Sequence, residues 1–266
     1  MTKPQRPVAF ILASTNHGSM LVNRHDYKLY ANGTKGYGVG FQLLNTSSCE
    51  QGEIDIALML LDARRKNYGD NVVAIDCGAN IGTHTIEWAK HMYGWGKVFS
   101  FEAQERIYYA LAGNITLNNC FNAKATLAAI SSEKGVMRIP VPDYFTPSTF
   151  GSLELKQNPN NEFIGQAIDY SDEKTTPIQT IAIDDLQLTR LDFLKIDIEG
   201  MEMEALNGAK NSIANLKPIL LIEKIKSSED EIRIFLKNLG YKIVPVDINL
   251  IAIHETDPAA SLIKES

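Results

Sequence analysis

The sequence predicts an α/β protein built on an open, mostly parallel sheet with helices on both faces. Short apolar segments, for example 72–75 and 218–222, alternate with segments in which apolar residues recur at helical spacing. Several apolar segments end in an acidic residue, and ligands of open parallel sheets bind at such strand ends. A hairpin over 241–254 follows five βα-type units, which is compatible with seven strands of which the last runs antiparallel.

The composition is that of an ordinary globular protein. The chain has 266 residues, of which 44% are hydrophobic and 22% charged, enough for one large domain or one domain with a cap. A net charge of −6 argues against nucleic acid or an anionic membrane as a partner. No run spans a membrane and residues 7–13 favour a strand over a signal peptide, so we expect a cytoplasmic protein. The oligomeric state stays open, and a dimer is compatible with the sequence.

Residues 1–70 are expected to form an N-terminal cap. The apolar segments 8–12 and 20–22 predict a hairpin, and the glycine-rich segment 33–40 predicts a flexible stretch. From residue 53 to residue 68 the apolar residues follow helical spacing. The scattered cysteines Cys49, Cys77 and Cys120 do not fit a disulfide framework or a cysteine-based zinc site.

Residues 72–90 predict a strand, a glycine turn and a helix. Asp76 ends the strand, Gly78 and Gly82 frame the turn, and Thr85 and Trp88 belong to the buried stripe of the helix. A βα unit of this kind binds nucleotides near the helix N-terminus. The alternative is a tight turn that holds no ligand.

The turn favours S-adenosylmethionine (SAM) over a dinucleotide. Asn80 and Thr83 replace the second and third glycines of G-x-G-x-x-G, so close approach by a pyrophosphate is not provided for. Asp76 would repel a phosphate and attract the cationic groups of SAM. The candidate cofactor-binding residues here are Asp76, Gly78, Ala79, Asn80 and Gly82.

A second acid lies at the end of the next predicted strand, 97–102. Glu102 follows Asp76 by 26 positions and is predicted to accept both ribose hydroxyls of an adenosine; otherwise it is an exposed strand-end acid. A helix over 107–119 leads to a third strand, 124–130, whose residues Ala129 and Ile130 are expected near the adenine.

The alternation breaks between residues 132 and 180. Five prolines and many Asn and Ser residues predict loops and short edge strands, and we interpret this segment as an insertion over the active site. Beyond it come a short strand at 180–183, a brief helical turn at 184–186 and a fourth main strand at 193–198. A helix over 201–213 that Gly208 interrupts, a fifth strand at 218–223 and a helix over 229–239 follow. The tail 255–266 is expected to fray.

Several motifs resemble the FkbM-type SAM-dependent methyltransferases. They are Ile75–Gly82, Phe101-Glu102-Ala103, Leu117-Asn118 and, most specifically, Leu191–Glu202 with its lysine–acid–glutamate–glycine–x–glutamate string. The resemblance covers 72–254 and implies a class I methyltransferase (Rossmann-like) fold, with 71–254 as the SAM-binding domain and Ala103 at the cofactor. It also implies O-methylation of a sugar, glycan or secondary-metabolite hydroxyl. Ala103-Gln104 stands where the family often has proline, and the cap matches only loosely, so the acceptor is not specified.

The most specific string lies at the end of the fourth strand. Strand alternation places Lys195 and Asp197 on one face, and a buried Lys195 needs a partner, either Asp197 or Glu223. Glu199 and Glu202 are three residues apart at a helix start and share a face.

Proton removal from an acceptor hydroxyl is assigned to one of five residues around this strand end. They are Asp197, Glu199, Glu202, Glu223 and His84. Glu199 and Glu202 could instead stabilise the helix N-terminus, and His84 could be a packing or substrate contact. A carboxylate site for Mg²⁺ at Asp197 and Glu223 is considered but not favoured.

Two other function classes remain. An NAD-dependent oxidoreductase or epimerase needs the missing glycines and a Tyr-x-x-x-Lys pair; Tyr93 and Lys97 have that spacing but fall between a helix and a strand. A non-catalytic SAM-binding protein would lack a productive acceptor pocket.

Overall fold

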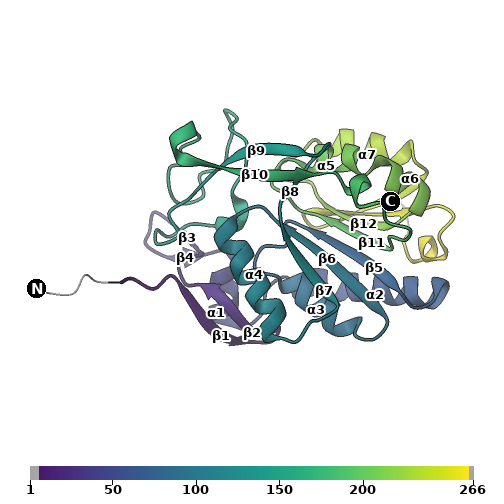
Figure 1. Cartoon of the computed structure of the whole chain (residues 1–266), viewed down its shortest axis with the longest axis horizontal. Helices are drawn as coiled ribbons and strands as arrows, with labels where there is room; N and C mark the ends of the chain where they lie inside the picture. The colour runs from purple at the N-terminus through teal and green to yellow at the C-terminus, as the bar shows by residue number, and fades with distance from the viewer. Residues whose placement is uncertain (1–5, 264–266) are drawn as a thin grey trace, which may run out of the picture. The chain divides into compact units, whose positions relative to one another are not determined.

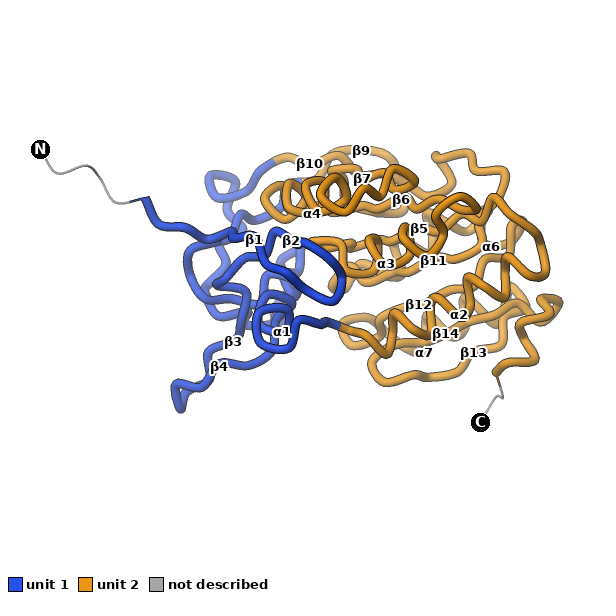
Figure 2. Tube along the Cα trace, turned by 90° about the horizontal axis from the view of Figure 1, so that it is seen from below, with its two compact units in different colours: residues 1–49, 138–176 blue, residues 50–137, 177–266 orange. Residues whose placement is uncertain are grey.

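A computed structural model describes residues 6–263 (Figure 1). The chain forms two compact units (Figure 2). The first unit comprises residues 1–49 and 138–176, and the second comprises residues 50–137 and 177–266. The predicted cap and insertion therefore contribute to one unit rather than forming separate pieces. Residues 1–5 of the predicted cap and 264–266 of the predicted tail lie outside the described residues.

The N-terminal part of the first unit consists of two small antiparallel pairs and a helix. Strand β1 (Phe10–Thr15) pairs with β2 (Gly18–Asn23), and β3 (Lys28–Leu29) pairs with β4 (Lys35–Gly36). Helix α1 (Val39–Thr46) occupies part of the stretch that the glycines suggested to be flexible. Gly40 serves close packing there, because a Cβ at this position would lie 2.4 Å from the carbonyl oxygen of Asn23.

A buried carboxylate joins the two segments of the first unit. Asp26 accepts hydrogen bonds from the backbone N–H groups of Gly40 and Phe150, at 2.9 and 3.2 Å. The Asn23 side chain donates to the carbonyl oxygen of Tyr144. The second segment adds the short 3₁₀ helices η1 (Phe150–Ser152) and η2 (Asp172–Lys174). Contacts this distant in sequence explain why the cap and the insertion fold together.

The second unit is built on a seven-stranded sheet, which confirms the predicted class I methyltransferase fold. The strand order is β13-β14-β12-β11-β5-β6-β7, and only β14 runs antiparallel to its neighbours. The strands are β5 (Val72–Cys77), β6 (Gly96–Glu102), β7 (Ala123–Leu127), β11 (Phe193–Ile196), β12 (Ile219–Glu223), β13 (Tyr241–Val246) and β14 (Asn249–His254).

Helices cover both faces of this sheet (Figure 1). The helices α2 (Gln51–Tyr68), α3 (Thr83–His91) and α4 (Glu105–Leu117) pack in succession over one face, so α2 belongs to this unit and not to the cap. The other face carries α5 (Glu202–Gly208), α6 (Lys210–Leu216) and α7 (Glu229–Lys237) over a core that includes Ile75, Leu194 and Ile222. The alternation predicted for the fourth strand is confirmed, because Phe193 packs against Trp88 of α3 while Leu194 joins the opposite core. None of the helices within 6–263 has the length and hydrophobicity needed to cross a membrane.

The predicted third strand, 124–130, is two strands in two sheets. The chain leaves the main sheet at Ala128, whose N–H still donates to the carbonyl oxygen of Glu102. Strand β8 (Ala129–Ile130) then pairs with β10 (Thr175–Ile181) in a small second sheet. Strand β9 (Gly135–Pro140) pairs with the other edge of β10. The 3₁₀ turn η3 (Ile183–Leu186) follows β10 in the chain. The predicted break in the helix after the fourth strand is present, since α5 ends at Gly208. A Cβ at Gly208 would lie 2.1 Å from the carbonyl oxygen of Ser131.

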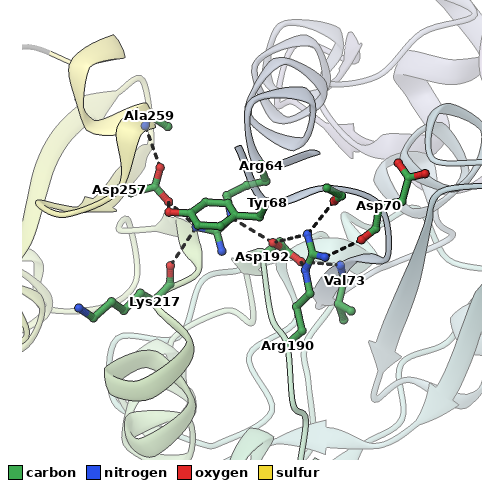
Figure 3. A network of polar contacts seen from close by, with 10 residues as sticks. Arg64, Tyr68, Asp70, Val73, Arg190, Asp192, Lys217, Asp257 and Ala259 are labelled. Carbon is green, nitrogen blue, oxygen red and sulfur yellow. Dashed lines mark hydrogen bonds and ion pairs between the residues drawn. The ribbon is translucent and has the colours of Figure 1, made fainter. Parts of the chain in front are cut away.

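The expected fraying of the tail is wrong for residues 255–263. Asp257 is buried and forms an ion pair with Arg64 of α2, and the 3₁₀ helix η4 (Pro258–Leu262) follows it. Arg64 also contacts buried Asp192 through Nε, at 3.1 Å from Oδ1 (Figure 3). Asp192 in turn accepts hydrogen bonds from Arg190 and from the backbone N–H of Val73. This network fixes β5, the residues before β11 and the C-terminal segment to α2.

Candidate functional site

The turn between β5 and α3 is shaped by contact with the segment that follows β11. Gly78 has a φ of +77°, and a Cβ on it would lie 1.7 Å from the carbonyl oxygen of Asp197. Asn80 also has a left-handed backbone, with φ +50°, and its side-chain oxygen accepts the N–H of Ile81. Buried Ala79 donates its N–H to the carbonyl oxygen of Phe101, and Gly82, with φ +96°, precedes the helix. The turn therefore contacts both neighbouring strand ends.

Glu102 lies beside this turn, as the sequence predicts. Its Oε2 accepts the backbone N–H of Asn80 at 3.0 Å, and its Oε1 accepts that of Gln104 at 2.7 Å. Burial raises the pKa of Glu102 to about 7, against the opposing effect of these backbone donors. The residue is therefore a buried acid beside the Gly78–Gly82 turn and not an exposed strand end. Ala103 directly follows it, half-buried.

Asp76 is buried and has one carboxylate oxygen without a hydrogen-bond partner among the described residues. Its Oδ2 accepts the hydroxyl of Thr85 at 2.6 Å, and Thr85 also contacts the hydroxyl of Ser100 at 2.7 Å. On the neighbouring strand Lys195 is its register partner. The helical spacing predicted Thr85 in the helix core. Ser100 was not predicted, although it is a polar residue inside an apolar strand.

Ala129 and Ile130 were expected near an adenine. Both are buried in β8, and Ile130 packs into the core below α5 and α6. The side chain of Ile130 therefore has a packing role. Ala129 lies two residues beyond Leu127, the register partner of Glu102, and stays a candidate contact.

Lys195 is paired with Asp197, one of the two partners that the sequence left open. The buried ammonium lies 2.7 Å from Oδ2 of Asp197. Burial disfavours the charged amine, but the charges of Asp197, Asp76 and Glu53 outweigh that effect and raise the pKa of Lys195 well above its usual value. Lys195 therefore stays cationic and fixes the carboxylate of Asp197.

Glu199 and Glu202 do not share a helix face as predicted. Helix α5 begins at Glu202, whereas Glu199 precedes it with a left-handed φ of +56°. The carboxylate of Glu202 accepts the backbone N–H groups of Ile198 and Gly200, both at 3.1 Å, and the hydroxyl of Ser227. This arrangement commits Glu202 to shaping the loop.

Three other carboxylates come together above the strand ends. One oxygen from each of Asp197, Glu199 and Glu223 lies within 4.8 Å of the others. Glu199 forms an ion pair with Lys226 at 2.6 Å. Burial, followed by the negative charge of Asp197, raises the pKa of Glu199 to about 8 and that of Glu223 to about 9.

His84 lies between two glutamates that sequence analysis did not select. Its Nε2 is 3.1 Å from Glu53 and its Nδ1 is 3.4 Å from Glu50, and the ring packs edge-on against Trp88. Burial alone would lower the pKa of His84, but the two glutamates have the larger effect and raise this pKa. The pKa of Glu53 falls to about 2, because the effects of His84 and Lys195 exceed that of its burial. Both ring nitrogens of His84 face carboxylates, which favour its protonated form and make it a poorer candidate for the base. Glu53 gave no distinctive signal, since acids are common in the first turn of a helix.

The model of the methyltransferase FkbM domain matches residues 76–243, more than half of the chain. This chain belongs to the FkbM methyltransferase family. It is 26% identical over 202 residues to Methyltransferase sdnD of Sordaria araneosa, covering 66% of this chain and 76% of that protein. It is 23% identical over 176 residues to Methyltransferase 1 of Beauveria bassiana (strain ARSEF 2860), covering 61% and 68%.

Among solved structures, this FkbM-family chain is similar to the methyltransferase FkbM of Methylobacillus flagellatus KT. The identity is 22%, the TM-score is 0.47, and the match covers 69% of this chain and 44% of that one. Membership of this family identifies the chain as a methyltransferase. The alternative function as an NAD-dependent oxidoreductase or epimerase, which the sequence left open, is therefore ruled out.

Proposed function

We propose that this FkbM-family protein binds SAM at the Gly78 turn and Glu102, and methylates a hydroxyl of a sugar, glycan or secondary metabolite. The observation that carries the proposal is the backbone contact between Gly78 and Asp197, because it holds an acidic loop directly against the cofactor turn. A methyl donor and an acceptor must meet within van der Waals reach for transfer. The contact between the two loops supports such an approach.

The residues at the turn fit the cationic cofactor. Asp76 offers a buried carboxylate oxygen without a partner in the described chain, which suits the amino group of SAM. Glu102 keeps lone pairs for the ribose hydroxyls. Ala79, Asn80 and Gly82 form the turn, and Ala103 and Ala129 are further candidate contacts of the cofactor. No phosphate cradle is present here to favour a dinucleotide.

The acidic loop supplies the remaining chemistry. When bound, SAM provides an activated methyl group, which passes to the acceptor oxygen while the electrons of the C–S bond stay on sulfur and leave S-adenosylhomocysteine. The chain must then orient the hydroxyl and take its proton. Asp197 is assigned this role because Lys195 fixes its carboxylate and its backbone lies against Gly78, whereas Glu202 and His84 are held by other partners.

Glu102→Gln should weaken the binding of S-adenosylhomocysteine at pH 8 by about 1–3 kcal/mol, because a charged acceptor of two hydroxyls is lost. The raised pKa of about 7 adds a pH dependence, since protonation removes the charge that the ribose contacts need. Wild-type affinity is therefore highest above that pKa and should fall about tenfold from pH 8 to pH 6. Calorimetric titration at both pH values tests this, and an equal pH dependence in Glu102→Gln would count against the assignment.

Asp197→Asn keeps the side-chain shape and removes the charge. Turnover should fall by roughly 10²-fold or more, while the affinity for S-adenosylhomocysteine should change much less. The measurement is single-turnover transfer of labelled methyl at saturating SAM, to the best acceptor from a screen of hydroxylated glycans and metabolites. Glu231→Gln, on the exposed side of α7, is the control for loss of one negative charge.

Two results would change the proposal. A wild-type rate in Asp197→Asn would move the proton-accepting role to Glu199 or Glu223. Binding of S-adenosylhomocysteine without methylation of any acceptor in the screen would favour the non-catalytic SAM-binding protein.

A further inference from the structure

We propose that Asp197, Glu199 and Glu223 form a binding site for one divalent cation of the Mg²⁺, Mn²⁺ or Ca²⁺ class. The site deepens the proposed function, on which only its role in catalysis rests. Sequence analysis considered Asp197 and Glu223 for Mg²⁺ without favouring it; the structure adds Glu199 and the geometry.

The oxygen positions suit a hard cation. Three carboxylate oxygens, one from each residue, lie within 4.8 Å of one another. Cations of this class bind oxygen at about 2.0–2.6 Å, so two ligands of one ion are separated by at most about twice that distance. Three such oxygens therefore fit around one ion, and an all-oxygen set selects Mg²⁺, Mn²⁺ or Ca²⁺ over softer metals.

Glu223 provides an independent sign of a missing ligand. It is the last residue of β12, its exposed fraction is only 6%, and its Oε2 has no hydrogen-bond partner among residues 6–263. An unpaired buried carboxylate is unfavourable, and such groups are normally paired or coordinate a metal. Because one oxygen of Glu223 also belongs to the three-carboxylate group, the unpartnered residue is part of the proposed site.

The charges around the site leave room for one divalent cation. Asp197, Glu199, Glu202 and Glu223 bring four carboxylates together, and Lys195 and Lys226 provide two ammonium groups, paired with Asp197 and Glu199. The two ammonium groups offset only two of the four charges that these carboxylates carry when all are ionised, so Glu199 and Glu223 hold protons in the ion-free protein and a divalent cation would replace them. Each lysine engages one carboxylate oxygen, so Asp197 and Glu199 each retain a second oxygen, which either binds an ion or, at Asp197 in the ion-free protein, takes the proton of the acceptor.

The most exposed carboxylate of the site belongs to Asp197, the residue whose backbone lies against Gly78. The side chains of Asp197 and Glu199 are 28% and 15% exposed, whereas Glu223 lies deeper. Three protein oxygens leave about three positions of an octahedral ion for water or another oxygen ligand. An acceptor with two neighbouring oxygens, such as a vicinal diol of a sugar, would occupy two of them beside Asp197 and Gly78.

The test is a titration of the whole protein with Mn²⁺ alone, without SAM or acceptor, in which free Mn²⁺ is followed by electron paramagnetic resonance. We expect about one saturable equivalent per chain that Mg²⁺ displaces. Glu223→Gln and Glu199→Gln should each weaken Mn²⁺ binding by about tenfold or more, whereas the exposed Glu231→Gln should bind like the wild type. Circular dichroism and thermal melts confirm that each variant is folded.

The absence of saturable Mn²⁺ binding by the wild type would overturn the proposal, and so would wild-type affinity in both folded variants. A parallel titration with S-adenosylhomocysteine separates this outcome from failure of the proposed function. If S-adenosylhomocysteine binds normally but Mn²⁺ does not, the cation site is wrong and the methyltransferase assignment stands.

Discussion

Gly78→Ala should abolish methyl transfer and strongly weaken cofactor binding. A Cβ at residue 78 would lie 1.7 Å from the carbonyl oxygen of Asp197 and 2.8 Å from its carbonyl carbon, and both atoms belong to backbone. Backbone cannot rotate away as a flexible side chain can, so either the cofactor turn or the loop with Asp197 must move. A displacement of about 1 Å at a reacting centre is enough to reduce a rate about 10²-fold.

The chain offers a matched control for the conformational strain of this substitution. Gly69 has a φ of +76°, almost that of Gly78 at +77°, but nothing lies within 4 Å of its hypothetical Cβ. Gly69→Ala should lose about 1–3 kcal/mol, because Gly69 combines a positive φ with an extended ψ of −178°, and it should keep its activity. Titration with S-adenosylhomocysteine and single-turnover assays compare the variants, and equal behaviour of the two would show that the contact with Asp197 does not matter.

Much of the second unit follows from local patterns. Strands β5, β6, β11 and β12 are short, mainly apolar runs with an acid at or next to their last residue, and each is found close to its predicted place. Because parallel strands align their carboxyl ends, Glu102 was expected beside the turn, and Asn80 donates to it there. The same alternation placed Lys195 and Asp197 on one face.

The first unit shows why other features escaped sequence analysis. Asp26 binds the N–H groups of Gly40 and Phe150, a contact that no periodicity encodes. The strands β3 and β4 have two residues each, which is too short for a pattern. At the candidate site, the left-handed backbone at Glu199 moves this residue out of the helix that its spacing from Glu202 suggested. Pairing of His84 with Glu53 likewise depends on the tertiary packing of α2 against α3.

Asp192→Asn should destabilise the second unit by about 3–5 kcal/mol. Asp192 is fully buried and receives the guanidinium groups of Arg64 and Arg190 and the N–H of Val73. Removing its charge leaves Arg64, itself 5% exposed, with Asp257 as its remaining carboxylate partner. Breaking one side of a buried ion pair is far more damaging than breaking an exposed one, because the remaining charge stays desolvated.

Asp70→Asn is the control for this prediction, because it breaks the ion pair of Arg65 and Asp70, whose side chains are 44% and 59% exposed. It should change the free energy of unfolding by no more than about 1 kcal/mol. Urea denaturation followed by circular dichroism measures both variants. Since the network also fixes Asp257, Asp192→Asn should expose the C-terminal segment to proteolysis before the rest of the unit unfolds. A loss in Asp192→Asn no larger than that in Asp70→Asn would mean that the buried network does not anchor α2, β5 and the C-terminal segment.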